Sequence, residues 1–291
     1  MRPNLPWARH LQFSLSHAFT RPLYWLFSHI PHYEYGLTTA SVTRLESPFE
    51  PLSGRRAVQI SDLHLDYYLP RHDTFIQTIA ALQPDWIFVT GDLLNVREGL
   101  PHLFRFLGQL RSLAPVYVTL GNHDYYSGVP VADFLELSDR HKLHLLINQT
   151  SVIPLSGGEL YIVGLDDPTT HRADVTCIPH RVPGRYTVVL AHAPVIFDLL
   201  EPHHAADLVL CGHSHGGQWR FGSFHPFWLP YGCRGRAHGH YFQKGQRLYV
   251  NRGLGWSLVP LRWNCSPEIV LVEWVSPCDD VGGTSMSGSR A

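Results

Sequence analysis

The stretch AVQISDLH, residues 57–64, joins a short, mostly apolar run to two polar side chains, Asp62 and His64. The run 57–60 is rich in β-branched and apolar residues and ends at a serine, a pattern that predicts a buried strand. Asp62 and His64 are two positions apart, so on an extended segment both side chains point the same way. An Asp-x-His pair just beyond a strand is well suited to chelating a metal ion.

The same pattern recurs four more times along the chain. Further apolar runs at 86–90, 116–120, 188–190 and 208–211 each precede a short polar block. Functional groups of open α/β sheets gather beyond the carboxyl ends of strands, so we expect these blocks to meet in space. Together with Asp62 and His64 they supply eight candidate ligands or catalytic groups, the other six being Asp92, Asn122, His123, His192, His213 and His215.

Each of these signals is weak when taken singly. A lone Gly-Asp is more often a turn, and a lone buried histidine is more often a hydrogen-bonded core residue. The Asp-x-His and His-x-His pairs are stronger, because two polar groups are costly to place together at a strand end without a metal. Their joint occurrence indicates a metal centre, and its imidazole, carboxylate and amide donors suit manganese, iron or zinc.

The order of the predicted elements indicates the fold class. Further strands are predicted at 160–163, 248–250 and 269–274, and helical periodicity occurs at 75–82, 103–110 and around 134–137. Strands alternate with helices over the first half of the chain, and strands dominate the second half. This order predicts an α/β core of buried sheets covered by helices on their outer faces, in one domain.

Composition excludes several classes of protein. A formal net charge of -1 with a sequence pI near 7.1 does not indicate a nucleic-acid partner. The five cysteines are odd in number and lack a CxxC pair, so neither a disulfide framework nor a zinc-thiolate site is predicted. A reducing compartment, hence a cytoplasmic location, is the simplest interpretation.

The five polar blocks, in order, resemble the signature D-x-H, G-D, G-N-H-[DE], H and G-H-x-H of the calcineurin-like metallophosphoesterases. The resemblance covers roughly residues 55–275. It implies a sandwich of two mixed β-sheets flanked by helices, with two divalent metal ions at the strand ends. Manganese is the first choice for these ions, with iron or zinc as alternatives. The activity implied is hydrolysis of a phosphate ester or anhydride by a water that the two ions activate.

The resemblance also assigns roles to the candidate residues. Asp62, His64 and His215 would hold the first metal, Asn122, His192 and His213 the second, and Asp92 would bridge the two. His123 would be a non-ligand histidine that donates a proton to the departing oxygen or stabilises it electrostatically. The role of Asp124 is left open.

Three later segments resemble a narrower bacterial branch of membrane-associated phosphodiesterases: CGHSHGGQ (211–218), YVNRGLG (249–255) and PLRWN (260–264). Some members of that branch hydrolyse UDP-2,3-diacylglucosamine, in lipid A synthesis, to a lipid monophosphate and UMP. This substrate implies a peripheral location on the inner membrane. Arg252 and Arg262 would be candidates to bind substrate phosphate.

Two other functions share the same metal residues. One is a phosphodiesterase or phosphomonoesterase that acts on a soluble substrate. The other is a non-enzymatic binding scaffold, which is disfavoured because no ligand position is missing. The sequence does not indicate an oligomeric state.

The two ends of the chain differ from the predicted domain, 51–275. Residues 1–50 begin as a basic, aromatic-rich amphipathic segment that either lies on an anionic membrane or packs on the domain as an extra helix. Its apolar run is too short to span a bilayer. Residues 276–291 are rich in Gly and Ser and predict a disordered tail. His238 and His240 form a second His-x-His pair in a Gly-rich loop, for which a solvated position is favoured over a substrate-facing role.

Overall fold

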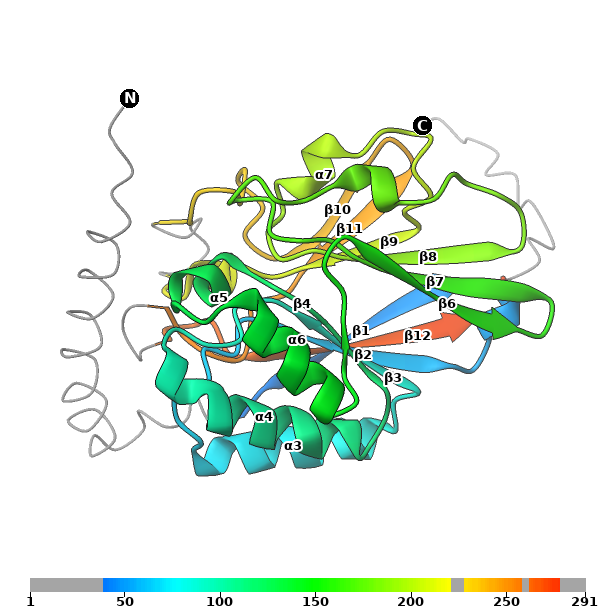
Figure 1. Ribbon diagram of the computed structural model, residues 1–291. Helices are drawn as coiled ribbons and strands as arrows, with labels where there is room; N and C mark the ends of the chain where they lie inside the picture. Colours follow the sequence, from blue (N-terminus) through cyan, green and yellow to red (C-terminus); the bar gives the residue numbers. More distant parts are fainter. Residues whose placement is uncertain (1–38, 221–227, 258–261, 278–291) are drawn as a thin grey trace, which may run out of the picture.

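The computed structural model describes residues 39–220, 228–257 and 262–277, which form two six-stranded β-sheets with helices on their outer faces (Figure 1). The predicted amphipathic segment at the amino-terminus and most of the predicted tail lie outside the described residues. The strands of the first sheet, in spatial order, are β1 (Ser41–Pro48), β12 (Glu268–Val275), β2 (Arg56–Ile60), β3 (Trp86–Thr90), β4 (Val116–Thr119) and β5 (His144–Leu145). Those of the second are β10 (Gly239–Gln243), β11 (Gln246–Val250), β9 (Leu208–Cys211), β8 (Arg185–Leu190), β7 (Gly158–Gly164) and β6 (Gln149–Leu155).

Both sheets are mixed, as the family resemblance implied. In the first sheet β2, β3, β4 and β5 are parallel, whereas β12 runs antiparallel to β2 and pairs in parallel with β1. In the second sheet β7, β8, β9 and β11 are parallel, and the two edge strands β6 and β10 are antiparallel to their neighbours. The predicted αββα fold class is therefore confirmed.

Helices and short 3-10 turns cover the sandwich. The helices α3 (Pro70–Leu82) and α4 (Leu100–Arg111) lie against the outer face of the first sheet, and α7 (Ile196–Leu199) lies over the second (Figure 1). The remaining helices within the described residues are α5 (Asn122–Tyr126) and α6 (Val131–Arg140). The 3-10 turns are η1 (Glu50–Leu52), η2 (Arg97–Gly99), η3 (Val175–Cys177) and η4 (His215–Gly217).

Alternate side chains of the central strands enter different hydrophobic layers. In β3, Phe88 points into the layer between the sheets, whereas Ile87 and Val89 pack with the helices outside. In β8, Val188 lies between the sheets and Val189 lies under α7. Burial on both faces explains why these strands are continuously apolar in the sequence.

Four strands were not predicted, and each lies at the edge of a sheet. One of them, β5, has only two residues. In β1 and β6 buried or half-buried residues alternate with exposed ones, and in β10 half-buried residues alternate with exposed ones, so none of these three contains a long apolar run. Strand β1 belongs to the first sheet through its pairing with β12, so the folded domain begins before the boundary predicted at residue 51. His240 also lies on a strand, β10, and not in a loop.

Candidate metal centre

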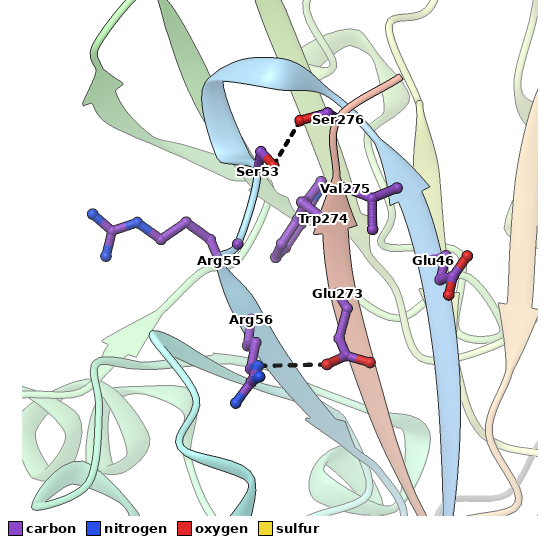
Figure 2. Close-up of a pocket in the computed structure, with 9 residues that line it drawn as sticks. Glu46, Ser53, Arg55, Arg56, Glu273, Trp274, Val275 and Ser276 are labelled. Carbon is purple, nitrogen blue, oxygen red and sulfur yellow. Dashed lines mark hydrogen bonds and ion pairs between the residues drawn. The ribbon is translucent and has the colours of Figure 1, made fainter. Parts of the chain in front are cut away.

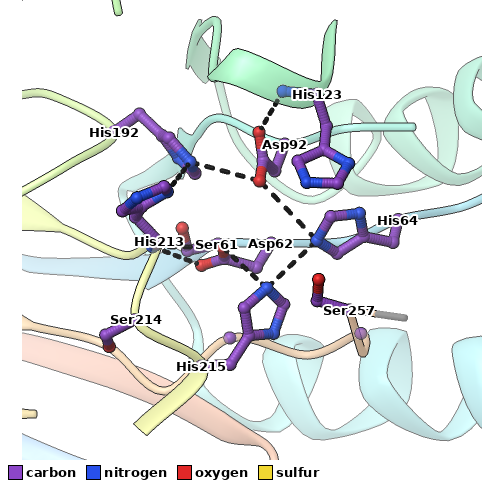
Figure 3. Close-up of polar contacts among 12 residues, drawn as sticks. Ser61, Asp62, His64, Asp92, His123, His192, His213, Ser214, His215 and Ser257 are labelled. Atoms are coloured by element: carbon purple, nitrogen blue, oxygen red, sulfur yellow. Dashed lines mark hydrogen bonds and ion pairs between the residues drawn. The ribbon is translucent and has the colours of Figure 1, made fainter. Parts of the chain in front are cut away.

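The loops that follow β2, β3, β4, β8 and β9 converge at one end of the sandwich and bring the predicted metal residues together (Figure 3). Two groups of these residues could each hold a metal ion. The first contains Asp62, His64, Asp92 and His215, and the second contains Asp92, His192 and His213. Within each group the ligand atoms lie within 4.8 Å of one another, and all of these residues are buried. Asp92 belongs to both groups, as a bridging ligand would.

Distances around Asp92 support this arrangement. Its Oδ2 atom lies 3.2 Å from His192 Nε2 and 3.7 Å from His64 Nε2. Burial on its own would raise the pKa of Asp92, but the surrounding histidines, His192 foremost, hold it well below its usual range. Asp92 is therefore a carboxylate, the form that ligates a cation.

Hydrogen bonds to backbone carbonyls set the tautomers in the second group. His192 Nδ1 donates to the Thr90 carbonyl at 2.9 Å, and His213 Nε2 donates to the Tyr231 carbonyl at 2.7 Å. In their neutral forms, the remaining nitrogens, His192 Nε2 and His213 Nδ1, both carry lone pairs, and they lie only 3.0 Å apart. Two lone pairs this close need a positive charge between them.

The pKa of His192 also indicates that positive charge is stabilised at this position. Burial lowers the pKa of this imidazole, yet the Asp92 and Asp62 carboxylates raise it to about 10. Positive charge is therefore favoured at the position that a metal ion would occupy. Asn122, at the start of α5, is a candidate for a further ligand, because its buried Oδ1 atom has no hydrogen-bond partner among the described residues. The residues of this group fit a divalent cation.

The first group is equally compact. His64 Nε2 and His215 Nε2 are 3.1 Å apart, and His215 Nε2 is 3.4 Å from Asp62 Oδ1. The Asp62 carboxylate also accepts the backbone N–H of His213 at 3.0 Å, which links the two groups. Burial and the charge of His64 hold the pKa of His215 well below its usual range, so its imidazole is neutral and able to ligate.

The backbone of the ligand loops differs from the expectation for Asp62 and His64. Both residues adopt a positive φ, 50° and 43°, instead of lying on an extended segment. Asp92, His213 and His215 are also in the left-handed region. For a residue with a Cβ this conformation costs on the order of 1 kcal/mol, so contacts elsewhere must hold these loops in place.

Glycines let the β3 and β4 loops approach each other. A Cβ on Gly91, whose φ is +79°, would lie 2.7 Å from both Gly121 N and His192 Nδ1. A Cβ on Gly121 would lie 2.4 Å from Asp92 Oδ1. The G-D and G-N-H-D blocks therefore need glycine for close approach as well as for turning.

Asp124 connects the same two loops. One carboxylate oxygen accepts the N–H groups of Leu93 and Leu94 at 2.8 and 3.3 Å, and the other accepts the N–H of Gly121 at 2.8 Å. Asp124 belongs to neither of the two groups that could hold a metal. Its hydrogen bonds give it the role that the sequence left open: it positions the loops that carry Asp92 and Asn122.

His123 lies beside the first group. Its backbone N–H donates to Asp92 Oδ1 at 2.8 Å, and its ring stands edge-on to that of His64 with centroids 4.7 Å apart. Burial lowers the pKa of His123 to about 3, with His64 and His192 adding to the effect against the opposing charge of Asp92. Its assignment as the catalytic histidine stays a prediction.

Sequence reasoning missed Asn95, which orients two histidines. Asn95 Oδ1 accepts Nδ1–H of His64 at 2.8 Å and Nδ1–H of His123 at 2.6 Å. Its Nδ2 donates to Asp66 Oδ2 at 2.9 Å, which fixes the orientation of the amide. The Nε2 atom of His64 is thereby left to ligate a metal. The signal in the sequence was a polar residue directly after the apolar pair that follows Gly91-Asp92.

Ser257 was also missed, and no pattern in the sequence marked it. Figure 3 shows its side chain directed toward the imidazoles of His64 and His215. Gln218 fixes the backbone of Ser257, because the amide donates to the Ser257 carbonyl at 3.1 Å and accepts its N–H at 2.8 Å. A hydroxyl group is thus held at the edge of the first group.

The two arginines predicted to bind phosphate are engaged with protein groups. Arg252 forms an ion pair with the buried Glu268 at 3.2 Å and donates to Ser41 Oγ at 2.6 Å. Arg262 is buried and donates to backbone carbonyls from all three of its nitrogens. These contacts do not support substrate binding, which stays a prediction for both residues. His238 is half-buried and His240 is exposed.

A separate recess of about 370 Å³ lies at the other end of the first sheet, near the start of β2 and the end of β12 (Figure 2). It shares no residue with the metal centre. Both of its arginines are paired, Arg56 with Glu273 at 3.4 Å and Arg55 with Asp85 at 2.7 Å, and Glu46 adds a further carboxylate. This recess therefore offers no free positive charge for a phosphate substrate.

Comparisons with known proteins agree with the site. Residues 55–217 match the family model of the calcineurin-like phosphoesterases. The metallophosphoesterase YkuE of Bacillus subtilis is 31% identical over 225 residues, which cover 75% of this chain and 78% of YkuE. The phosphodiesterase YaeI of Escherichia coli is 29% identical over 225 residues, covering 74% of this chain and 80% of YaeI.

Among solved structures, a phosphopantetheinyl hydrolase from Mycobacterium tuberculosis is similar, with 14% identity and a TM-score of 0.40 over 70% of this chain and 91% of that one. The family match and the relatives establish that this chain belongs to the calcineurin-like phosphoesterases, and it is therefore a hydrolase with an Asp/His metal site. Within the described part of the chain, no helix has the length and apolar character needed to cross a membrane.

Proposed function

We propose that this protein hydrolyses a phosphodiester or pyrophosphate bond with the help of two divalent metal ions, manganese in the first instance. The observation that carries this proposal is the position of Asp92, shared between two buried groups of ligands. Two cations at such a centre would neutralise phosphoryl oxygens and would lower the pKa of water, and so would supply hydroxide at neutral pH.

The surrounding residues have distinct tasks in this proposal. Asp62, His64 and His215 hold one ion, and Asn122, His192 and His213 hold the other. Asn95 binds Nδ1 of His123 and so orients the ring, which leaves Nε2 as the nitrogen that can face the substrate. From this position His123 would stabilise the charge of the departing oxygen or, when Nε2 carries a proton as well as Nδ1, would donate that proton to it. Both tasks place His123 in contact with the leaving group.

For the substrate we propose UDP-2,3-diacylglucosamine, cleaved to a lipid monophosphate and UMP at the inner membrane surface. Support comes from the segments 211–218, 249–255 and 260–264, which resemble membrane-associated phosphodiesterases, and from the basic, aromatic-rich composition at the start of the chain. The relative YaeI of Escherichia coli is named as a phosphodiesterase, which is consistent with diester or pyrophosphate chemistry.

The test is turnover by the metal-stripped full-length protein after reconstitution with Mn²⁺. The substrates are a generic diester, a monoester, and UDP-2,3-diacylglucosamine in detergent micelles, with Asp92→Asn and His213→Ala as inactive controls. Preference for the lipid nucleotide with release of UMP would support the whole proposal. Turnover of the generic diester alone would keep the metal chemistry and reject the substrate. Absence of metal-dependent turnover with all three would reject the proposed function.

A further inference from the structure

Arg262 is a buried arginine beside the first metal group, and most of its partners are backbone carbonyls. It also contacts two side chains, Cys265 Sγ at 3.9 Å and His215 Nδ1 at 3.5 Å. Only 5% of its surface is exposed. Nε and NH2 donate to the Gly255 carbonyl at 2.8 and 2.5 Å, and NH2 also donates to the Arg252 carbonyl at 2.8 Å. NH1 lies 3.4 Å from the carbonyl oxygens of His215 and Cys265. One guanidinium group therefore joins three segments of backbone.

No carboxylate forms an ion pair with Arg262 in the described part of the chain. A buried positive charge without a carboxylate is costly unless other groups hydrogen-bond it. Here carbonyl oxygens hydrogen-bond the guanidinium group, and N–H groups of all three nitrogens donate to them. The N–H groups of Arg262 are therefore engaged with the protein and not with a substrate phosphate. Its guanidinium group is fixed at the point where the three backbone segments meet.

One of these segments, the loop 252–255, packs directly on the loop that carries Asp62. Leu254 N donates to the Ser61 carbonyl at 2.9 Å, and Gly255 N donates to the Asp62 carbonyl at 2.7 Å. The contact is too close for any side chain, because a Cβ on Gly255 would lie 2.4 Å from the Leu63 carbonyl oxygen. Through this loop, Arg262 restrains the backbone of Asp62, and through NH1 it restrains that of His215.

The ligands restrained in this way need external support. Asp62, His64 and His215 all have positive φ angles, between 43° and 50°, so their loops would relax if the surrounding contacts were lost. The second group has different restraints. His192 is held by the Thr90 carbonyl and His213 by the Tyr231 carbonyl, and neither histidine has a hydrogen bond with Arg262 among the described residues.

We propose that Arg262 is a positioning residue for the first metal site, acting through the backbone of His215 and of the loop 252–255. This inference rests on the proposed dinuclear centre. Removing the guanidinium group would release Asp62 and His215 from their ligand geometry and leave the second site able to bind. The chain would then hold one metal ion where it should hold two.

The experiment is calorimetric titration of the metal-stripped full-length protein with Mn²⁺, together with electron paramagnetic resonance of the loaded sample. Wild type is expected to bind two ions and to give the signal of a spin-coupled pair. Arg262→Met is expected to retain one ion, to bind the other at least tenfold more weakly, and to lose the coupled signal. Arg262→Lys should behave likewise, because one ammonium group cannot reach carbonyls on both sides.

Double variants identify the site that is lost. Adding His64→Ala to Arg262→Met should change the stoichiometry no further, whereas adding His192→Ala should remove the remaining ion. The matched control is Arg185→Met. Arg185, the first residue of β8, is half-buried, pairs with Glu159 at 3.7 Å, and stacks on Tyr161. This control should bind two ions.

Binding of two ions by folded Arg262→Met with wild-type affinity would overturn the inference. If Arg262→Met does not fold, Gly255→Ala decides the question, since it displaces the same loop without removing a buried charge, and two tightly bound ions in that variant would equally overturn the inference. If wild type itself binds fewer than two ions, the proposed dinuclear centre fails, which is a different result.

Discussion

Asp92 is the residue on which both halves of the metal centre depend, and the residues around it decide what the centre can do. His123 touches Asp92 through its backbone N–H and touches Asn95 through its ring. It is not needed to complete either group of ligands. Its contribution can therefore be measured separately from metal binding.

We expect His123→Ala to slow turnover by about 10²- to 10⁴-fold, the usual range for loss of a general acid, while the protein keeps its metal. If His123 donates a proton, the loss should be large for diesters with poor leaving groups and small for p-nitrophenyl esters, whose leaving group needs no proton. Rates on a series of aryl and alkyl diesters, with metal content measured in parallel, distinguish the two roles. An equal loss across the series would indicate electrostatic stabilisation, and an emptied metal site would show that the assigned role is wrong.

Asn95 offers a second test at the same scale. Asn95→Ala removes the shared acceptor of His64 and His123, so both rings lose their fixed tautomer and orientation. Loss of such a partner typically costs 10- to 100-fold in metal affinity or activity. Metal affinity and kcat measured on the same samples should both fall by about that factor. Wild-type values for both would mean that other contacts orient the two rings.

At the scale of elements, the start of α3 contains a buried histidine unrelated to the metal centre. His72 Nδ1 accepts the backbone N–H of Leu69 at 2.8 Å, which caps the helix, and its ring packs against Tyr68, Phe75 and Phe106. Burial, with the charge of Arg71 adding to it, lowers the pKa of His72 to about 2. In the unfolded chain this pKa is about 6.5. Below that pH the unfolded state binds a proton at His72, whereas the folded state does not.

Stability should therefore fall as the pH drops below about 6.5, by about 1.4 kcal/mol per pH unit from this residue. His72→Asn keeps a capping acceptor and does not titrate. Between pH 7 and pH 5 we expect the metal-free wild type to lose about 2 kcal/mol more than His72→Asn, measured by urea unfolding. Parallel pH profiles for the two proteins would contradict the buried, neutral state of His72.

The central elements could be predicted from the sequence, and the edge elements could not. Strands such as β3 and β8 are buried on both faces, so an apolar run marks each of them and the polar block after it. Strand β1 has one exposed side and only a few apolar residues, and its place in the sheet depends on pairing with β12 at the other end of the chain.

The same distinction applies to the site. The metal ligands directly follow apolar strands, so the sequence could predict them. The contacts that Asn95 and Arg262 make could not be predicted from the sequence. The partners of Arg262 are backbone carbonyls of distant segments, and carbonyls carry no sequence signal. The positive φ angles of Asp62 and His64 likewise come from long-range contacts and override the extended conformation that their spacing suggested.

At the scale of the whole molecule, the metal centre connects the two sheets. Asp62, Asp92 and Asn122 follow strands of the first sheet, and the other ligands that would share ions with them, His192, His213 and His215, follow strands of the second. Ions bound there would hold the two sheets together at that end of the sandwich. Metal binding should therefore be coupled to the stability of the whole domain and not only to the order of the loops.

We expect the melting temperature of the metal-stripped protein to rise with added Mn²⁺. Each ion bound only by the folded state adds about 2.7 kcal/mol to the free energy of unfolding at a free concentration of 100 Kd. Thermal unfolding at several Mn²⁺ concentrations, followed by circular dichroism and with EDTA as the reversing agent, measures the effect. Asp92→Asn, which weakens the ligand shared by both ions, should abolish most of it. A melting temperature that does not respond to Mn²⁺ in the wild type would mean that the ligands meet without binding metal tightly enough to join the sheets.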